Sequence, residues 1–181
     1  MGQSPSADLY FGYDLGGPED DDPTAMPEWM DNGDDWEDVL ARRLGWVEAP
    51  FPDDYPQGRS HVYRFGTDEY KAAREADDKR VTEYKATSPK YLAYEASRAE
   101  KDRLLATVPV ELDTYGYLDG DSPYAMRVVT SVQRAYDYGS IRLNPLVEAE
   151  EWRDHLARFI ELLGFDLGDK QPGWHLNCSY G

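Results

Sequence analysis

Cysteine and histidine are nearly absent from this sequence, and their scarcity excludes several kinds of site. The 181 residues contain one cysteine, Cys178, and three histidines. A single cysteine excludes an internal disulfide framework, a four-cysteine zinc site and a Cys-x-x-Cys redox pair. His175 and Cys178 lie three residues apart in an expected strand, so their side chains point to opposite faces and do not form a thiolate–imidazole pair. We expect Cys178 to be a small buried side chain and His155 to be structural.

Long apolar runs and nucleotide-binding motifs are missing as well. No segment approaches the roughly 18 apolar residues of a membrane-spanning helix, and the N-terminal residues lack the pattern of a signal peptide. The glycine-rich signatures of nucleotide binding do not occur, nor do the His-Glu-x-x-His and Gly-x-Ser-x-Gly signatures of two hydrolase classes. We therefore expect no cofactor and no membrane contact.

Positive charge is scarce and unevenly distributed. The chain has 36 acidic and 19 basic residues, a formal net charge of −17. Residues 1–60 hold 15 acidic and three basic residues, a net charge of −12, whereas residues 61–181 hold 21 and 16, a net charge of −5. Such a surface repels nucleic-acid phosphates and anionic membranes, and it attracts basic protein surfaces. The candidate interaction surface comprises Asp20, Asp21, Asp22, Asp34, Asp35 and Asp38.

The length and composition predict one folded domain over residues 1–181. Apolar residues make up 40% and aromatic residues 13% of the chain, more than a disordered chain of this charge contains. Within this domain, residues 1–60 form an acidic N-terminal third with irregular loops.

Four segments have the β-branched and aromatic composition of strands, namely residues 7–15, 108–118, 124–132 and 174–180. Turn-forming residues between the second and the third indicate a hairpin. The two terminal strands cannot be stable alone, so we expect them in one sheet with the hairpin. A short extended piece is expected at residues 61–65.

Two helices have clear start and stop signals. Apolar residues at helical spacing predict a helix over residues 34–44, with Asp34 and Glu37 as a capping box and Gly45 just after its end. The Asn144-Pro145 pair predicts the start of a second helix over residues 146–163, which Gly164 ends.

The region of about residues 67–106 is helical but weakly amphipathic. Thr67 and Asp68 open one helix, and Ser88 with Pro89 starts the next, which has a thin apolar stripe of Leu92, Ala96 and Ala99. We expect both helices to be peripheral, and the pattern leaves open whether they form an arm.

Strands and helices do not alternate regularly, which favours the α+β class over a doubly wound parallel sheet. We expect a small, mainly antiparallel sheet of about four strands with helices packed on one face.

Tyrosine is in excess, with 14 residues, many of them in or near the expected strands. Tyrosine is typical of protein interfaces, and it is equally typical of strands, where it serves packing. Both interpretations stay open.

Three parts of the chain resemble a family of small uncharacterised proteins from phages of actinobacteria. They are SPSADLYFGYDLG at 4–16, VELDT at 110–114 with DSPYAMRV at 121–128, and PGWHL at 172–176 with SYG at 179–181. The resemblance implies a phage product that acts in the host cytoplasm. It implies no reaction and no functional residue.

Taken together, these features predict a non-enzymatic phage protein whose acidic residues bind a basic host protein, as an inhibitor that mimics DNA would. One alternative is a carboxylate enzyme or nucleotide-processing factor that uses a divalent metal, although neither residues 20–22 nor Asp119 with Asp121 have the spacing of an EF-hand loop. Another alternative is a structural or assembly protein of the phage.

Overall fold

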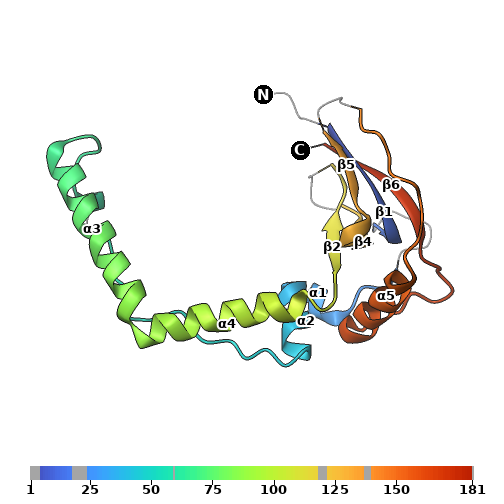
Figure 1. Ribbon diagram of the computed structural model, residues 1–181, viewed down its shortest axis with the longest axis horizontal. Coiled ribbons are helices and arrows are strands. Elements are labelled where there is room, and N and C mark those ends of the chain that lie inside the picture. The colour runs from blue at the N-terminus through green and yellow to red at the C-terminus, as the bar shows by residue number, and fades with distance from the viewer. Residues whose placement is uncertain (1–4, 18–23, 59, 118–121, 137–139, 181) are drawn as a thin grey trace. The chain divides into compact units, whose positions relative to one another are not determined.

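The computed structural model describes residues 5–17, 24–58, 60–117, 122–136 and 140–180 (Figure 1). The chain divides into two compact units. Unit 1 comprises residues 1–44 and 105–181, and unit 2 comprises residues 45–104, which are inserted between the two parts of unit 1. The expectation of a single domain stays a prediction.

Unit 1 contains a six-stranded sheet in which β1 is central. The strand order is β2-β4-β1-β6-β3, and β5 also pairs with β1. All neighbours are antiparallel except β3 and β6. The strands are β1 (Pro5–Gly16), β2 (Val110–Thr114), β3 (Gly116–Tyr117), β4 (Tyr124–Val128), β5 (Gln133–Tyr136) and β6 (Gly173–Tyr180). The helices of unit 1 are α1 (Glu28–Asp31), α2 (Trp36–Arg43) and α5 (Glu150–Leu163).

The expected α+β class is confirmed, and the four expected strands are present as β1, β2, β4 and β6. The terminal strands share one sheet with the hairpin, as expected. The second hairpin strand is shorter than the sequence predicts, because a 3₁₀ turn at Val129–Ser131 interrupts it before β5. Ser131 fixes this turn, since its Oγ accepts a hydrogen bond from the amide of Phe11 (2.9 Å) and donates one to the carbonyl of Val128 (2.7 Å).

The hydrophobic core of unit 1 lies between one face of the sheet and the helices α2 and α5. Successive strand residues point to opposite faces, so Phe11, Met126 and Val128 enter this core whereas Tyr10 and Arg127 lie on the other face. The helical residues that complete the core are Val39 and Leu40 of α2 and Trp152, Leu156, Phe159 and Leu163 of α5.

The start of α2 differs by one residue from the expected capping box. Asp35, not Asp34, is the N-cap, and its Oδ1 accepts a hydrogen bond from the amide of Glu37 (2.8 Å). Gly45 follows the helix with a φ of +97°, the left-handed conformation expected for the residue that ends it.

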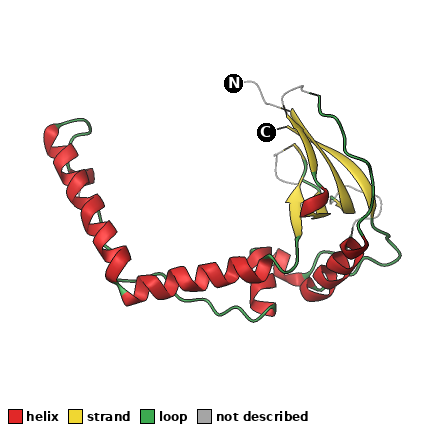
Figure 2. Ribbon diagram, in the orientation of Figure 1, coloured by secondary structure: helices red, strands yellow, loops and turns green. Residues whose placement is uncertain are grey.

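The predicted start of α5 at Asn144-Pro145 is wrong. The helix begins at Glu150, and Figure 2 shows the described chain before it as loop. The amide of Val147 donates a hydrogen bond to the carbonyl of Pro145 (2.9 Å), a three-residue turn that a helix cannot contain, and the amide of Asn144 binds the side chain of Gln133 (2.6 Å). Leu146 and Val147 are exposed and therefore extend no apolar helix face. Gly164 ends the helix with a φ of +73°, as predicted.

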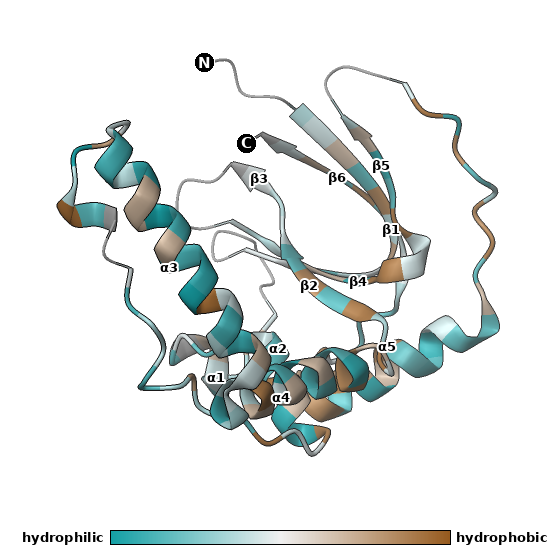
Figure 3. Ribbon diagram, turned by 60° about the vertical axis from the view of Figure 1, so that its left-hand side comes forward, coloured by the Kyte–Doolittle hydropathy of each residue, from teal (hydrophilic) through white to brown (hydrophobic). Residues whose placement is uncertain are grey.

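Unit 2 consists of a long loop and two helices, α3 (Asp68–Thr87) and α4 (Pro89–Leu105), the last residue of which belongs to unit 1. The expected caps are confirmed, because Thr67 Oγ1 accepts from the amide of Tyr70 (3.2 Å) and Ser88 Oγ accepts from the amide of Tyr91 (3.4 Å). Figure 3 shows a largely hydrophilic α3.

Two details of unit 2 contradict the sequence prediction. Residues Ser60–Val62 form a 3₁₀ turn instead of part of an extended piece at 61–65. The predicted stripe of α4 is also wrong, since Leu92 is 50% exposed and both alanines of the stripe are exposed. The inner face of α4 is instead formed by Tyr91, Tyr94 and Ser97.

This inner face exists because the loop packs against it through aromatic rings and hydrogen bonds. Tyr55 contacts Tyr84 and Tyr91, with ring centroids 5.5 and 5.9 Å apart. Trp46 Nε1 donates a hydrogen bond to the carbonyl of Ser97 (2.8 Å). Tyrosines that the sequence leaves unassigned therefore form the core of unit 2.

Among the described residues, no helix combines the length and the apolar character that crossing a membrane requires.

Gly12 provides a test of the sheet geometry. A Cβ atom at Gly12 would lie 1.9 Å from the backbone oxygen of Met126, whereas one at its cross-strand partner Gly173 would meet nothing within 4 Å. We predict that Gly12→Ala lowers the free energy of unfolding by about 3 kcal/mol, because a backbone atom must move to admit the methyl group. Urea unfolding measures this loss, and Gly173→Ala is the control. Equal stability of the two variants would contradict the prediction.

Candidate functional site

The structure places three of the six predicted interaction residues around α2. Asp34 and Asp35 are exposed at the start of the helix. Asp38 lies one turn further on and forms an ion pair of 3.8 Å with Arg42. Asp20, Asp21 and Asp22 lie outside the described residues. The structure therefore brings Asp34 and Asp35 together. Asp38 differs from them because its carboxylate is paired with Arg42.

Asp34 and Asp35 line a pocket of about 360 Å³ in unit 1. Its aromatic walls are Trp29 of α1, Trp36 of α2 and Tyr124 of β4, and Leu112 of β2 also contributes. Three separate parts of the sequence thus meet at one pocket, which the sequence analysis did not predict.

The walls of this pocket are fixed by the core behind them. Trp29 Nε1 donates a hydrogen bond to the carbonyl of Leu163 (2.8 Å), at the end of α5. Trp36 packs edge-on against Phe159, with ring centroids 5.7 Å apart. Trp36 and Tyr124 are half-buried, so each ring keeps an exposed part. Rigid walls with exposed aromatic surface are typical of preformed binding sites.

The aspartates of the pocket differ in how they are engaged. Asp35 caps α2 through Oδ1. Asp113 also lines the pocket, but its Oδ2 lies 2.5 Å from Arg127 Nη2 and its Oδ1 accepts from the amide of Thr114 (2.9 Å). The carboxylate of Asp34 has no hydrogen-bond or ion-pair partner among the described residues. Asp34 is therefore the acidic group of the pocket that is open to a ligand.

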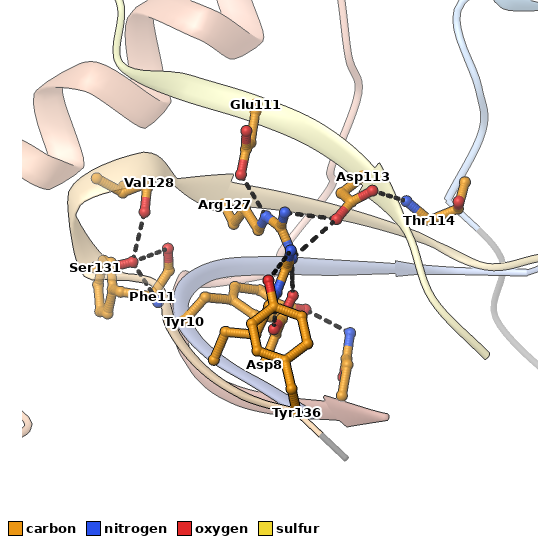
Figure 4. Close-up of polar contacts among 12 residues, drawn as sticks. Asp8, Tyr10, Phe11, Glu111, Asp113, Thr114, Arg127, Val128, Ser131 and Tyr136 are labelled. Carbon is orange, nitrogen blue, oxygen red and sulfur yellow. Dashed lines mark hydrogen bonds and ion pairs between the residues drawn. The ribbon is translucent and has the colours of Figure 1, made fainter. Parts of the chain in front are cut away.

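On the face of the sheet opposite the core, Arg127 is surrounded by carboxylates (Figure 4). Its side chain is 9% exposed and contacts Asp8 through Nη1 (2.7 Å) and Glu111 through Nε (2.6 Å). Together with Asp113, three acids from β1 and β2 bind one arginine of β4. Asp8 also pairs with Arg134 of β5. We name these five residues the arginine cluster.

Tyr10 lies beside this cluster and is fully buried. Its hydroxyl accepts a hydrogen bond from Asn177 Nδ2 (2.9 Å), and its ring stacks on His175 with centroids 5.5 Å apart. Burial raises the pKa of Tyr10 above its ordinary value of 10.0, and the negative charge of Asp14 adds to this. His175 therefore packs against Tyr10, and Cys178 lies on the opposite face of β6 from His175.

Cys178 is exposed, so its predicted burial is wrong. It points to the same face as Trp174 and Leu176, but only Trp174 reaches the core, and Leu176 is 67% exposed. The helices thus leave the C-terminal part of β6 uncovered, and replacement of Cys178 by serine has no buried apolar site to disturb. His155 is half-buried on α5, and its structural role stays a prediction.

The acidity of the chain belongs to one folded unit. Unit 1 contains 24 acidic and eight basic residues, a net charge of −16, whereas unit 2 contains 12 and 11, a net charge of −1. Most cations of unit 1 are already engaged: Arg127 and Arg134 in the arginine cluster, Arg42 with Asp38, Arg153 with Glu148, Arg43 with the carbonyl of Leu162, and Lys170 with Thr24. Unit 1 therefore presents an excess of uncompensated carboxylates.

Among the described residues, no group of three or more His, Cys, Asp or Glu side chains is arranged to hold a metal ion. Comparisons with protein-family models, curated proteins and solved structures give no match to this chain. Its function is therefore inferred from its own geometry and charge.

Arg127→Met tests the arginine cluster. The variant removes the buried cation that Asp8, Glu111 and Asp113 share, and Asp8 and Asp113 keep only Arg134, so we predict a loss of about 3 kcal/mol in the free energy of unfolding. Arg153→Met is the control, because the Arg153–Glu148 pair is exposed and its removal should cost less than about 1 kcal/mol. Chemical denaturation compares the two, and a loss for Arg127→Met as small as the control would refute the role of the cluster.

Tyr10→Phe tests the buried phenol through pH. A folded-state pKa above the ordinary 10.0 means that the unfolded chain ionises first, so the stability that this group contributes is present below pH 10 and is lost as pH rises above it. We predict that between about pH 9 and about pH 11 the free energy of unfolding falls less steeply in Tyr10→Phe, by up to about 1.4 kcal/mol per pH unit. Identical slopes would contradict the prediction. A constant offset between the proteins reflects only the lost hydrogen bond.

Proposed function

We propose that this chain is a non-enzymatic binding protein whose acidic unit 1 binds a basic protein surface. The observation that carries the proposal is the net charge of −16 of unit 1, in which most basic side chains are already paired internally. A field of this sign concentrates basic partners near the surface and accelerates their encounter.

The chemistry of the partner follows from the same charge. Basic surfaces that bind nucleic acids are shaped for a high density of negative charge, which the carboxylates of unit 1 offer in place of phosphates. The proposed partner is therefore a nucleic-acid-binding protein, and binding would compete with its DNA or RNA. In the setting that the phage resemblance implies, this partner is a host protein in the host cytoplasm, and the chain acts as its inhibitor.

The described residues add no specific observation in favour of the two alternatives, a metal-dependent carboxylate enzyme and an assembly protein.

Partner binding should depend strongly on salt and on the candidate aspartates. The partner is first captured with the tagged protein from an actinobacterial lysate and purified. Replacing Asp20, Asp21, Asp22, Asp34, Asp35 and Asp38 by asparagine should slow association on the order of tenfold in low salt, while dissociation changes less. Asparagine is as good an N-cap as aspartate, so the Asp35 substitution preserves α2. Surface plasmon resonance measures both rates.

A charge-matched control comes from unit 2, by amide substitution of six exposed acidic residues, Glu48, Glu69, Glu75, Asp78, Glu95 and Asp102. This variant should associate nearly as fast as the unmodified protein, because the same net charge is removed from the other unit. If association ignores both salt and the substitutions in unit 1, the proposed function is wrong.

A further inference from the structure

The pocket beside α2 has aromatic walls, which electrostatic attraction of a basic partner does not require. Three aromatic side chains, Trp29, Trp36 and Tyr124, meet there around a cavity of about 360 Å³. The volume is at the lower end of the range for ligand sites, so it suits one side chain rather than a folded segment.

We propose that this pocket receives an arginine side chain of the basic partner, with the guanidinium group against the exposed rings of Trp36 and Tyr124 and beside the carboxylate of Asp34. This inference rests on the proposed function, since it names the group by which the partner is anchored.

The pocket favours a cation because of both its walls and its open carboxylate. The faces of aromatic rings are negative and attract cations, tryptophan most strongly. Asp34 lacks a cation among the described residues, whereas the carboxylate of Asp113 is already bound by Arg127. A neutral apolar group would leave Asp34 without a partner and reduce its hydration, which is unfavourable. An anion would be repelled by unit 1 as a whole.

Arginine fits this pocket better than lysine does. Its guanidinium group is planar, so it stacks on aromatic rings while its edge donates hydrogen bonds to a carboxylate. A lysine ammonium group is compact and more strongly hydrated, and it loses more on entering an aromatic cavity. Asp35 is adjacent to Asp34, and although its Oδ1 caps α2, its negative charge adds to that of Asp34.

The backbone of the pocket is held in place before any ligand binds. The amide of Asp34 donates a hydrogen bond to the carbonyl of Trp29 (3.1 Å), and the amide of Gly33 donates one to that of Met30 (3.0 Å). Gly33 adopts a φ of +74°, which allows the chain to turn between α1 and α2. The main chain that carries Asp34 is thus tied to that of Trp29, and binding requires little ordering of the backbone of the site.

The test uses two soluble peptides of equal charge, alike except that one carries arginines where the other carries lysines. Titration against the full chain is followed by calorimetry and by the indole NMR signals of the tryptophans. The arginine peptide should bind about fivefold more tightly than the lysine peptide. Trp36→Leu and Tyr124→Leu should each abolish this preference while leaving the salt dependence unchanged, because neither substitution alters charge. Tyr136→Leu, an exposed tyrosine outside the pocket, is the control and should keep the preference.

The outcomes separate this inference from the proposed function. If both peptides bind equally, or if the pocket variants keep the arginine preference, the pocket is not the anchor, and salt-dependent binding of the captured partner would still support the proposed function. If neither peptide binds, the arginine site is refuted. Thermal melting verifies that each variant is folded, and the two pocket variants come from different elements, α2 and β4, so one unfolded variant does not remove the test.

Discussion

The guanidinium group of Arg127 is the contact on which the sheet of unit 1 depends. It joins β4 to Asp8 of β1 and to Glu111 and Asp113 of β2, and Asp8 continues the connection to Arg134 of β5. Four strands are therefore linked by charge on one face of the sheet, while apolar packing links β1, β2 and β4 on the other. A buried cation of this kind also specifies the register, because a slip of one residue would place it in the core.

The same cluster explains why so acidic a unit still presents open carboxylates. Two of its eight basic residues are used inside the sheet, and others are held by neighbouring acids or carbonyls. The carboxylate of Asp113 is withdrawn toward Arg127, which leaves Asp34 as the open acid beside the aromatic walls. Unit 1 has few basic side chains, and most of them are paired within the unit. Its surface therefore stays strongly negative.

Local signals in the sequence predicted most of the helices and strands, but they did not predict which of these elements contact one another. The glycines at 45 and 164 marked helix ends correctly, since a left-handed φ is a local property. The prediction from Asn144-Pro145 is wrong, because the amide of Val147 binds the carbonyl of Pro145 in a tight turn and Leu146 and Val147 find no apolar surface to pack on. The pocket could not be predicted either, since it requires the packing of α1 and α2 beside the β2–β4 pair. The sequence placed Trp36 in a helix and Tyr124 in a strand, but it gave no sign that the two side chains line one pocket.

The central position of β1 has a consequence for biosynthesis. This strand is made before its neighbours β4, β5 and β6, which follow more than one hundred residues later. Contacts so distant in sequence make folding slow, and the ribosome must reach β6 before the sheet can be completed. Until its neighbours are made, the aromatic strand β1 has unpaired backbone groups, and an exposed segment of this kind promotes aggregation. We expect the acidic residues that follow it to keep nascent chains apart by mutual repulsion, so the charge that we assign to partner binding would also protect the protein before it is folded.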